Sequence, residues 1–287
     1  MTQTQAAPAA RARLLRTVLR SPSALTGGVL VLLVVLCALF APLLAPFDPV
    51  AYNPADRLQG PSLEHPLGTD IYGRDTFSRV LFGARTSLAV AAISITLALL
   101  AGGIAGALAG FFRGNVDVVV MRLSDILLAF PAVLLAIALL AFLGGGFWNL
   151  TLAIAVVYSA PFARVARASV LRVREEAYVE ASHALGNSPW RILFRHVLPN
   201  AASPLIVEVS LRLAFAILAE ASLSYLGLGT QPPAPSWGQM IADGRQLLET
   251  SPWISIGPGL AITLTVLGFN LLGDGLRDLL DPRLRRQ

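Results

Sequence analysis

The sequence predicts an all-α integral membrane protein with six transmembrane helices. Of its 287 residues, 55% are hydrophobic and only 14% are charged, and the mean hydropathy is +0.67. This balance lies outside the range of ordinary soluble domains. A transmembrane helix needs about 20 predominantly apolar residues. Six stretches meet this requirement, at approximately 25–46, 86–112, 122–143, 147–168, 203–228 and 254–276.

The first apolar stretch is expected to be a retained membrane helix. Four arginines precede it, as in a signal peptide, but its apolar run is too long and no small-residue cleavage site follows it. The chain contains no lysine, so all 22 basic residues are arginines. With the N-terminus in the cytoplasm, sixteen of them lie in cytoplasmic segments, five lie outside and Arg212 lies in the fifth span. Because basic residues favour cytoplasmic loops, we expect both termini to be cytoplasmic, although four arginines in 47–85 weaken this asymmetry.

The spans divide the chain into four parts. These are a cytoplasmic tail (1–24), the first helix with an external segment (25–85), a transmembrane core with a cytoplasmic loop at 164–200 (86–280), and a second cytoplasmic tail (281–287). The middle of the 47–85 segment is expected to form an ordered ledge at the membrane surface. In the second span, small residues recur every four positions, a pattern that lets two helices approach closely; they are Gly102, Gly106 and Gly110.

The residues that common catalytic and metal sites require are missing. Three histidines lie far apart, and the single cysteine, Cys37, stands in an apolar run, so neither a zinc site nor a disulfide is expected. There is no serine-hydrolase elbow or recognisable catalytic pair of carboxylates. A Walker A loop needs a lysine beside the phosphates. We therefore expect no catalytic residue, no metal and no cofactor on this chain, and its arginines indicate membrane topology rather than nucleic-acid binding.

A few polar residues lie within the predicted spans. Glu208 and Arg212 are four residues apart with the acid first, which favours an ion pair on one helix. The pair either locks the helix to its neighbours or lines a transport route. Glu220 lies further along without a local partner and is the stronger candidate for the translocation pathway. Asn270 in the sixth span is a second candidate.

The loop at 164–200 is expected to contain two short helices joined at a glycine corner. Gly186 provides the left-handed stop of the first helix. Ser188 and Pro189 have the properties of an N-cap and a first helical residue, and Pro199 is expected to end the second helix. So short a loop cannot cover all of its own apolar side chains, so they need either the ends of the chain's other helices or a partner protein: Val179, Leu185, Trp190, Leu193 and Val197.

The stretch EASHALGNSPWRILFRHVLP resembles the EAA loop of bacterial ABC importer permeases. Glu180 and Ala181 match the pattern, Gly186 has the expected spacing, and Leu198-Pro199 closes the motif. Ser182 replaces the second alanine. His196 replaces the usual isoleucine, either as a feature of the peptide-importer branch or as a tolerated core-facing residue. The resemblance implies that the loop forms a coupling helix that docks on a separate ATPase subunit, with the matching residues as its coupling site.

Four further segments resemble the DppC/OppC type of dipeptide and oligopeptide permease: HPLGTDIYGRDTFSRVLFGARTSL, ILAEASLSYLGLG, PSWGQM and GFNLLGDGLRDLLDPRLR. The resemblance implies a MetI-like core with one extra N-terminal helix in the bacterial inner membrane. It further implies a second, homologous DppB/OppB-type permease, two ATP-binding subunits that use ATP and Mg²⁺, and an external substrate-binding protein.

The substrate class stays open at this point. Dipeptides or oligopeptides are expected first, and nickel chelates, glutathione and oligosaccharides are alternatives within the same importer class. Two other functions remain as competitors. A secondary transporter would be expected to have broken helices in inverted repeats, and a membrane scaffold would not need a docking loop with a glycine corner.

Overall fold

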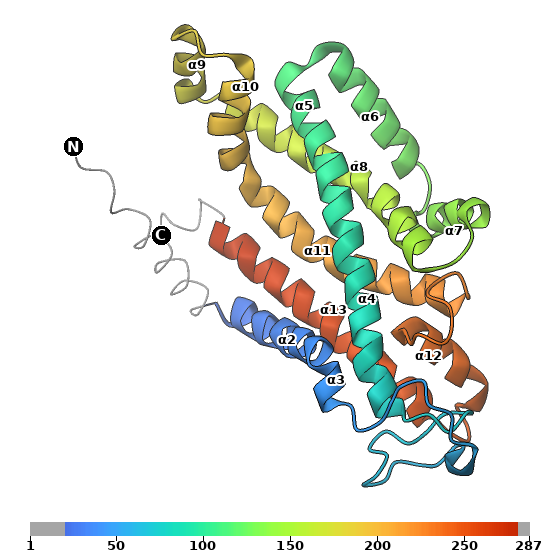
Figure 1. Cartoon of the computed structure of the whole chain (residues 1–287). Coiled ribbons are helices and arrows are strands. Elements are labelled where there is room, and N and C mark those ends of the chain that lie inside the picture. Colours follow the sequence, from blue (N-terminus) through green and yellow to red (C-terminus); the bar gives the residue numbers. More distant parts are fainter. Residues whose placement is uncertain (1–20, 281–287) are drawn as a thin grey trace.

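The computed structural model describes residues 21–280, and within this range it is helical apart from loops and one isolated β-bridge (Figure 1). The 281–287 tail and most of the predicted 1–24 tail lie outside the described residues. The helices are α2 (Pro22–Leu39), α3 (Ala41–Leu44), η1 (Pro54–Asp56), α4 (Thr76–Ala98), η2 (Leu99–Gly103), α5 (Ile104–Phe112), α6 (Gly114–Leu128), α7 (Ala132–Leu143), α8 (Phe147–Arg174), α9 (Ala177–Ala184), α10 (Pro189–Ile192), η3 (Leu193–Val197), α11 (Leu198–Tyr225), α12 (Trp237–Gly244), η4 (Arg245–Leu247) and α13 (Trp253–Leu280).

Within residues 21–280, five helical runs are long and apolar enough to cross a membrane, and a sixth span is present if α6 and α7 count as one. The predicted six spans are therefore confirmed with one correction. The segment 122–143 is not a single helix, because α6 and α7 meet at an angle of 94°. The cause is Pro131, which has no N–H to donate and disfavours helical geometry at Phe130.

The second span begins about three turns earlier than predicted. The Asp75 carboxylate caps α4 by accepting the Ser78 N–H at 2.7 Å. From Thr76 the helix continues through the π turn η2 to Phe112, a run of 37 residues. At 1.5 Å per residue this run is roughly 55 Å long, which exceeds a hydrocarbon core of about 30 Å. The end of the predicted external segment 47–85 is therefore helical.

The glycines of the second span allow backbone contact with α8, as predicted. A methyl group built on Gly102 would lie 1.9 Å from the Ser159 carbonyl oxygen, and one on Gly106 would lie 2.1 Å from that of Ala163. At Gly110 the nearest atom would be the Arg167 carbonyl oxygen at 2.8 Å. Only glycine permits this close an approach at the first two positions.

The N-terminal helix α2 packs along α13, the last span (Figure 1). At Gly27 an added methyl group would lie 2.3 Å from the Leu272 amide nitrogen, and at Gly275 it would overlap the backbone of Ala24. These two close contacts attach the extra helix to the core, while its opposite face stays exposed and apolar.

The loops gather at two opposite ends of the bundle, which we call the α12 end and the α9–α10 end (Figure 1). At the α12 end, the Gly146 N–H donates to the Gly229 carbonyl at 3.0 Å and the Trp253 indole N–H donates to the Thr69 carbonyl at 3.2 Å. At the α9–α10 end, the ring of Phe112 lies 5.1 Å from that of Trp190. The loop that follows the first span therefore contacts the segment that follows α11, and the end of the second span contacts the segment that follows α8.

We expect Gly106→Ala to destabilise the protein by about 1–3 kcal/mol, the usual cost of overpacking, because the new methyl group would push α5 away from α8. Gly103→Ala is the matched control, since its nearest neighbour is the flexible Leu99 side chain at 3.3 Å. The temperature at which detergent-purified protein loses its monodisperse elution peak measures the difference. Equal melting temperatures for the two variants would contradict the packing described here.

Candidate functional site

The loop between α8 and α11 has the predicted helix, glycine corner and helix. Helix α9 ends at Ala184 with Leu185 as its C-cap, and Gly186 follows with φ +76, in the left-handed region that favours glycine. The Ser188 hydroxyl caps α10 by accepting the Arg191 N–H at 3.4 Å, with Pro189 as the first helical residue. The loop starts later than predicted, however, because α8 continues to Arg174.

Ser182, one of the two residues that depart from the EAA pattern, stabilises this corner. The Asn187 side-chain amide donates to the Ser182 hydroxyl at 3.1 Å and to the Ser182 carbonyl at 3.3 Å. An alanine at this position would keep only the bond to the carbonyl. The sequence signal was the Ser182 substitution itself, but its partner five residues away became evident only in the structure.

The prediction that Pro199 ends the second helix is wrong. Helix α10 continues through the π turn η3 into α11, giving one helical run, Pro189–Tyr225. In this turn the Leu198 N–H donates to the Leu193 carbonyl, five residues back. A π turn widens the helix locally, which makes room for the Pro199 ring, and Pro199 needs no N–H partner because it stands at the start of α11. The loop is thus directly continuous with a membrane span.

The apolar side chains of the loop divide into a buried and an exposed set. The buried set packs on the ends of α5 and α8, against Ala107, Phe111 and Val170; it comprises Val179, Ile192, Leu193 and Val197. The exposed set forms what we call the loop surface, and its members are Leu185 (82% exposed), Phe194 (62%), Trp190 (53%) and Tyr178 (44%). The ends of the chain's own helices therefore cover one set, and the single chain leaves the other set exposed.

The residues that match the EAA pattern lie around this surface. Glu180, Ala181, Gly186 and Pro199 are exposed, and Leu198 is half-buried. Aromatic rings continue the surface, with Trp190 placed 6.0 Å from Phe194 and 5.1 Å from Phe112. His196 is half-buried, and its carbonyl accepts the Asn200 amide at 2.7 Å. The arrangement offers an apolar aromatic surface bordered by Arg191 and Arg195.

Two arginines assigned to the loop by sequence instead attach α6 to α8. Arg164 donates to the Asp125 carboxylate at 2.7 Å, and Arg167 forms a two-pronged contact with Asp117, one branch of which measures 2.6 Å. These acids and bases are 39 and 50 residues apart in the chain. No local spacing could have predicted the two ion pairs.

The predicted pair on the fifth span is present. The Arg212 Nε donates to the Glu208 carboxylate at 2.6 Å, one helical turn away. The Arg212 guanidinium also lies over the Tyr158 ring on α8, 5.7 Å from its centroid. The pair therefore neutralises two charges on α11 and contacts a neighbouring helix.

Glu220 and Asn270 differ in their surroundings. The prediction that Glu220 lacks a local partner is wrong, because the Ser224 hydroxyl donates to its carboxyl group at 2.7 Å. The Glu220 side chain is completely buried within the chain. Asn270 is half-buried on α13. The two residues thus do not share one exposed face in this conformation.

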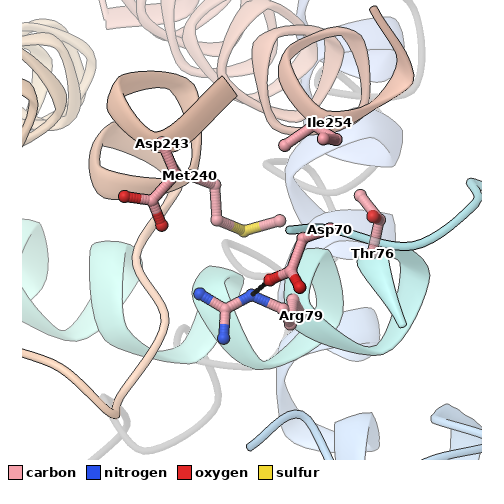
Figure 2. A pocket seen from close by; sticks show the side chains of 6 residues that line it. All are labelled: Asp70, Thr76, Arg79, Met240, Asp243 and Ile254. Atoms are coloured by element: carbon pink, nitrogen blue, oxygen red, sulfur yellow. Dashed lines mark ion pairs between the residues drawn. The ribbon is translucent and has the colours of Figure 1, made fainter. Parts of the chain in front are cut away.

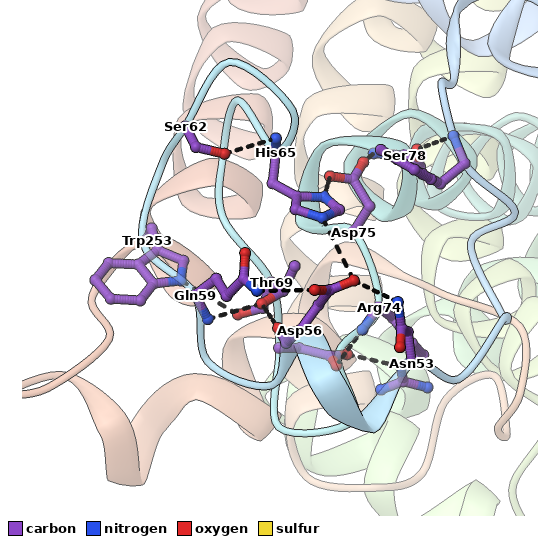
Figure 3. A network of polar contacts seen from close by, with 12 residues as sticks. Asn53, Asp56, Gln59, Ser62, His65, Thr69, Arg74, Asp75, Ser78 and Trp253 are labelled. Atoms are coloured by element: carbon purple, nitrogen blue, oxygen red, sulfur yellow. Dashed lines mark hydrogen bonds and ion pairs between the residues drawn. The ribbon is translucent and has the colours of Figure 1, made fainter.

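The segment that precedes α4 is folded around polar contacts, as the expected ledge would be (Figure 3). The Asp70 carboxylate accepts N–H groups from Tyr72 and Arg74 and the Arg74 Nε at 2.7 Å. The buried His65 ring lies 2.9 Å from Asp75, the cap of α4. Of the four arginines that weakened the orientation argument, Arg74 and Arg79 are thus paired with Asp70.

A small polar cavity lies where this segment meets α12 (Figure 2). Its volume is about 10 Å³, roughly that of a single water molecule. Arg79 points into it between Asp70, at 3.6 Å, and Asp243 of α12. Burial raises the pKa of Asp243, while the nearby Arg79 and Arg74 act in the opposite direction. Charges from the ledge and from α12 thus meet at this cavity.

Comparison with known proteins finds two family models that match this chain. Residues 98–286 match the binding-protein-dependent transport system inner membrane component, and residues 11–61 match the N-terminal transmembrane domain of oligopeptide transport permease C. The dipeptide permease DppC of Alkalihalophilus pseudofirmus is 46% identical, covering 91% of this chain and 86% of the relative. The glutathione permease GsiD of Pectobacterium atrosepticum is 45% identical, covering 94% and 90%.

A solved structure shares the fold. A chain of the MetNI methionine ABC transporter in an inward-facing conformation superposes with a TM-score of 0.59, covering 71% of this chain and 97% of its own length. Sequence identity is 19%, so this likeness concerns the fold alone. It agrees with the predicted MetI-like core, to which the extra N-terminal helix is added.

We expect Arg212→Gln alone to destabilise the protein more than the double change Glu208→Gln with Arg212→Gln. The single variant leaves a carboxylate without its partner in a span, whereas the double variant removes both charges. The double-mutant cycle should give a coupling free energy of about 0.5–3 kcal/mol. Thermal unfolding of the detergent-purified variants measures it, with the exposed Arg245→Gln as control. Additive effects would show that the pair has no structural role.

Proposed function

The chain belongs to the family of binding-protein-dependent transport system inner membrane components, and we propose that it forms half of the translocation pathway of an ATP-driven peptide importer. It is a permease subunit of the DppC/OppC type, within the peptide and glutathione class of ABC importers. Such a subunit has no ATPase site of its own, in keeping with the absence of lysine from the sequence.

The loop surface is the observation that carries the proposed coupling role. It exposes four large apolar side chains beside arginines, and it stands at one end of a helical run that continues to Tyr225. An apolar patch with aromatic anchors is the usual core of a protein–protein interface. We assign it to the cleft of a partner ATPase. Glu180 and Ala181 would orient the loop, Gly186 would permit its corner, and Leu198-Pro199 would transmit movement into α11.

The remaining partners follow from the same proposal. A second, homologous permease would complete the pathway, two ATPase subunits would use ATP and Mg²⁺, and a substrate-binding protein would dock at the α12 end. The arginine count supports a bacterial inner-membrane location with both termini in the cytoplasm. ATP-driven closure of the ATPases would then shift the permease pair between inward-open and outward-open states, since each state makes different contacts.

The substrate is proposed from the relatives. Similar permeases are named for the transport of dipeptides, of di- and tripeptides and of glutathione. We therefore propose a short peptide, with glutathione as the alternative and nickel chelates or oligosaccharides as more distant ones. Asn270 is the polar pathway residue we retain, because its half-buried side chain lies on α13 within the span. Glu208 and Arg212 are assigned a structural role.

Uptake by proteoliposomes that hold the complete complex, with ATP enclosed in the lumen and the substrate-binding protein added outside, distinguishes this function from its competitors. We expect uptake of a labelled dipeptide to require ATP and to persist when a protonophore dissipates the proton gradient. Omitting the substrate-binding protein should abolish it. Uptake that follows the proton gradient without ATP would indicate a secondary transporter, and a complex that assembles without transporting any peptide or glutathione would indicate a scaffold.

We expect Trp190→Ala to weaken binding of the partner ATPase by at least about tenfold, since a central tryptophan at an interface commonly contributes 2 kcal/mol or more. The matched control is Trp148→Ala, which removes a similarly exposed tryptophan (65% against 53% for Trp190) from the start of α8, near the opposite end. Co-purification of the ATPase at increasing salt and dilution measures retention. Equal retention by both variants would remove the loop surface from the coupling site.

A further inference from the structure

A polar junction joins three helices near the α12 end. We call it the Glu220 junction and define it by Ser87, Glu220, Ser224, Ser236 and Trp237. Glu220 is fully buried on α11 and accepts the Ser224 hydroxyl at 2.7 Å. The hydroxyls of Ser87, on α4, and Ser236, at the start of α12, lie near the same carboxyl group. Three separate elements thus present hydroxyl groups to one buried acid.

Helix α12 is fixed to the bundle at this junction. The Ser87 hydroxyl accepts the Trp237 N–H at 3.3 Å, and the Trp237 indole N–H donates to the Val80 carbonyl at 3.0 Å. Ser236 caps α12 by accepting the Gln239 N–H at 3.4 Å. At Gly238 an added methyl group would lie 2.2 Å from the Ala221 carbonyl oxygen. The first turn of α12 therefore lies directly against α11 and α4.

Packing alone does not require an acid here. One carboxyl oxygen of Glu220 has no hydrogen-bond partner among the described residues, and no arginine of residues 21–280 lies within ion-pair distance. Burying a polar group without a full set of partners costs free energy, and such groups within membrane spans are functional candidates. The hydroxyl cluster around Glu220 is therefore suited to a neutral, hydrogen-bonded carboxyl group, since an ionised one would lack a counter-ion.

The junction lies far along the same helical run that begins at the loop surface. Trp190 and Glu220 both belong to Pro189–Tyr225, and at 1.5 Å per residue their separation along the helix is roughly 45 Å. A displacement of the loop is thus carried by continuous backbone to the point where α12 is attached. The two ends of the molecule are connected by one element.

We propose that Glu220 is a positioning residue that ties α12 to α11, so that movement of the loop surface is transmitted to the α12 end. This inference rests on the proposed function, because the movement is supplied by a partner ATPase. The carboxyl group of Glu220, oriented by Ser224 and placed beside Ser236 at the start of α12, keeps the first turn of α12 against α11 while the loop moves. Glu220 then acts through α12 and need not touch the substrate.

A fluorescent reporter at the α12 end tests the proposal in the purified complex of both permeases and the ATPases. The label is attached at Gln246→Cys, an exposed position just beyond α12, with Cys37→Ser and with cysteines of the other subunits replaced. The signal is the fluorescence change on adding ATP and vanadate. ATP hydrolysis is measured on the same samples. Glu220→Leu is the main variant, and Ser222→Leu places the same side chain at an exposed site two residues away.

We expect Glu220→Leu to hydrolyse ATP within about twofold of the unchanged complex but to lose the fluorescence change by about tenfold, the scale of a typical coupling free energy. Glu220→Gln should retain at least half of the change, because its amide can replace a neutral carboxyl group. Ser222→Leu should behave as the unchanged complex. A full response from Glu220→Leu, or equal loss in Glu220→Leu and Glu220→Gln, would overturn the role assigned to Glu220.

Failure of the proposed function would look different, because the complex with unchanged Glu220 would then neither assemble with an ATPase nor hydrolyse ATP. If Glu220→Leu does not assemble, Ser224→Ala serves instead, since it keeps Glu220 but removes the α11 hydroxyl that orients its carboxyl group toward α12. We expect it to assemble and to reduce the fluorescence change by about threefold, the effect of losing one hydrogen bond. An undiminished response in that variant would overturn the proposal.

Discussion

The backbone contact between α5 and α8 is the interaction on which the candidate coupling site depends. Three glycines, Gly102, Gly106 and Gly110, bring the two helices close together. Their ends then form a platform of Ala107, Phe111 and Val170, and the buried half of the loop rests on it. With that half buried, the remaining aromatic side chains have a fixed outward direction. The exposed surface is thus positioned by a contact that is itself free of functional groups.

A second consequence follows from the continuity of the chain at this platform. Because the π turn η3 accommodates Pro199, the loop is joined to α11 without a flexible connection. Helix α11 ends beside α12, and the hydrogen bond from Trp237 to Ser87 attaches α12 to α4. The ledge in turn contacts α12 through Asp70, Arg79 and Asp243 around one small cavity. Packed contacts therefore extend from one end of the molecule to the other, which is what the proposed coupling role requires.

Local patterns in the sequence predicted much of this structure. Apolar length located the spans, glycine spacing indicated the α5–α8 contact, and cap residues at Ser188 and Gly186 gave the loop its corner. The errors arose where distant or compensating contacts decide. Pro131 breaks a helix whereas Pro199 does not, because a π turn precedes only the second. The partners of Arg164, Arg167 and Asn187 could not be predicted from span assignment, and the Ser224 partner of Glu220 was missed because a hydroxyl group carries no charge to identify it.

The bend between α6 and α7 restricts how this subunit can sit among its neighbours. Helix α7 has 12 residues, about 18 Å, and so is too short to cross a hydrocarbon core of about 30 Å. If α6 and α7 together form one span, the elbow at Ala129, Phe130 and Pro131 lies within the depth of the bilayer, and in the single chain it is exposed. Carbonyl groups released by the bend cannot be satisfied by lipid tails. That elbow must therefore be covered by another polypeptide or face a water-filled space, which orients this side of the subunit away from the lipid.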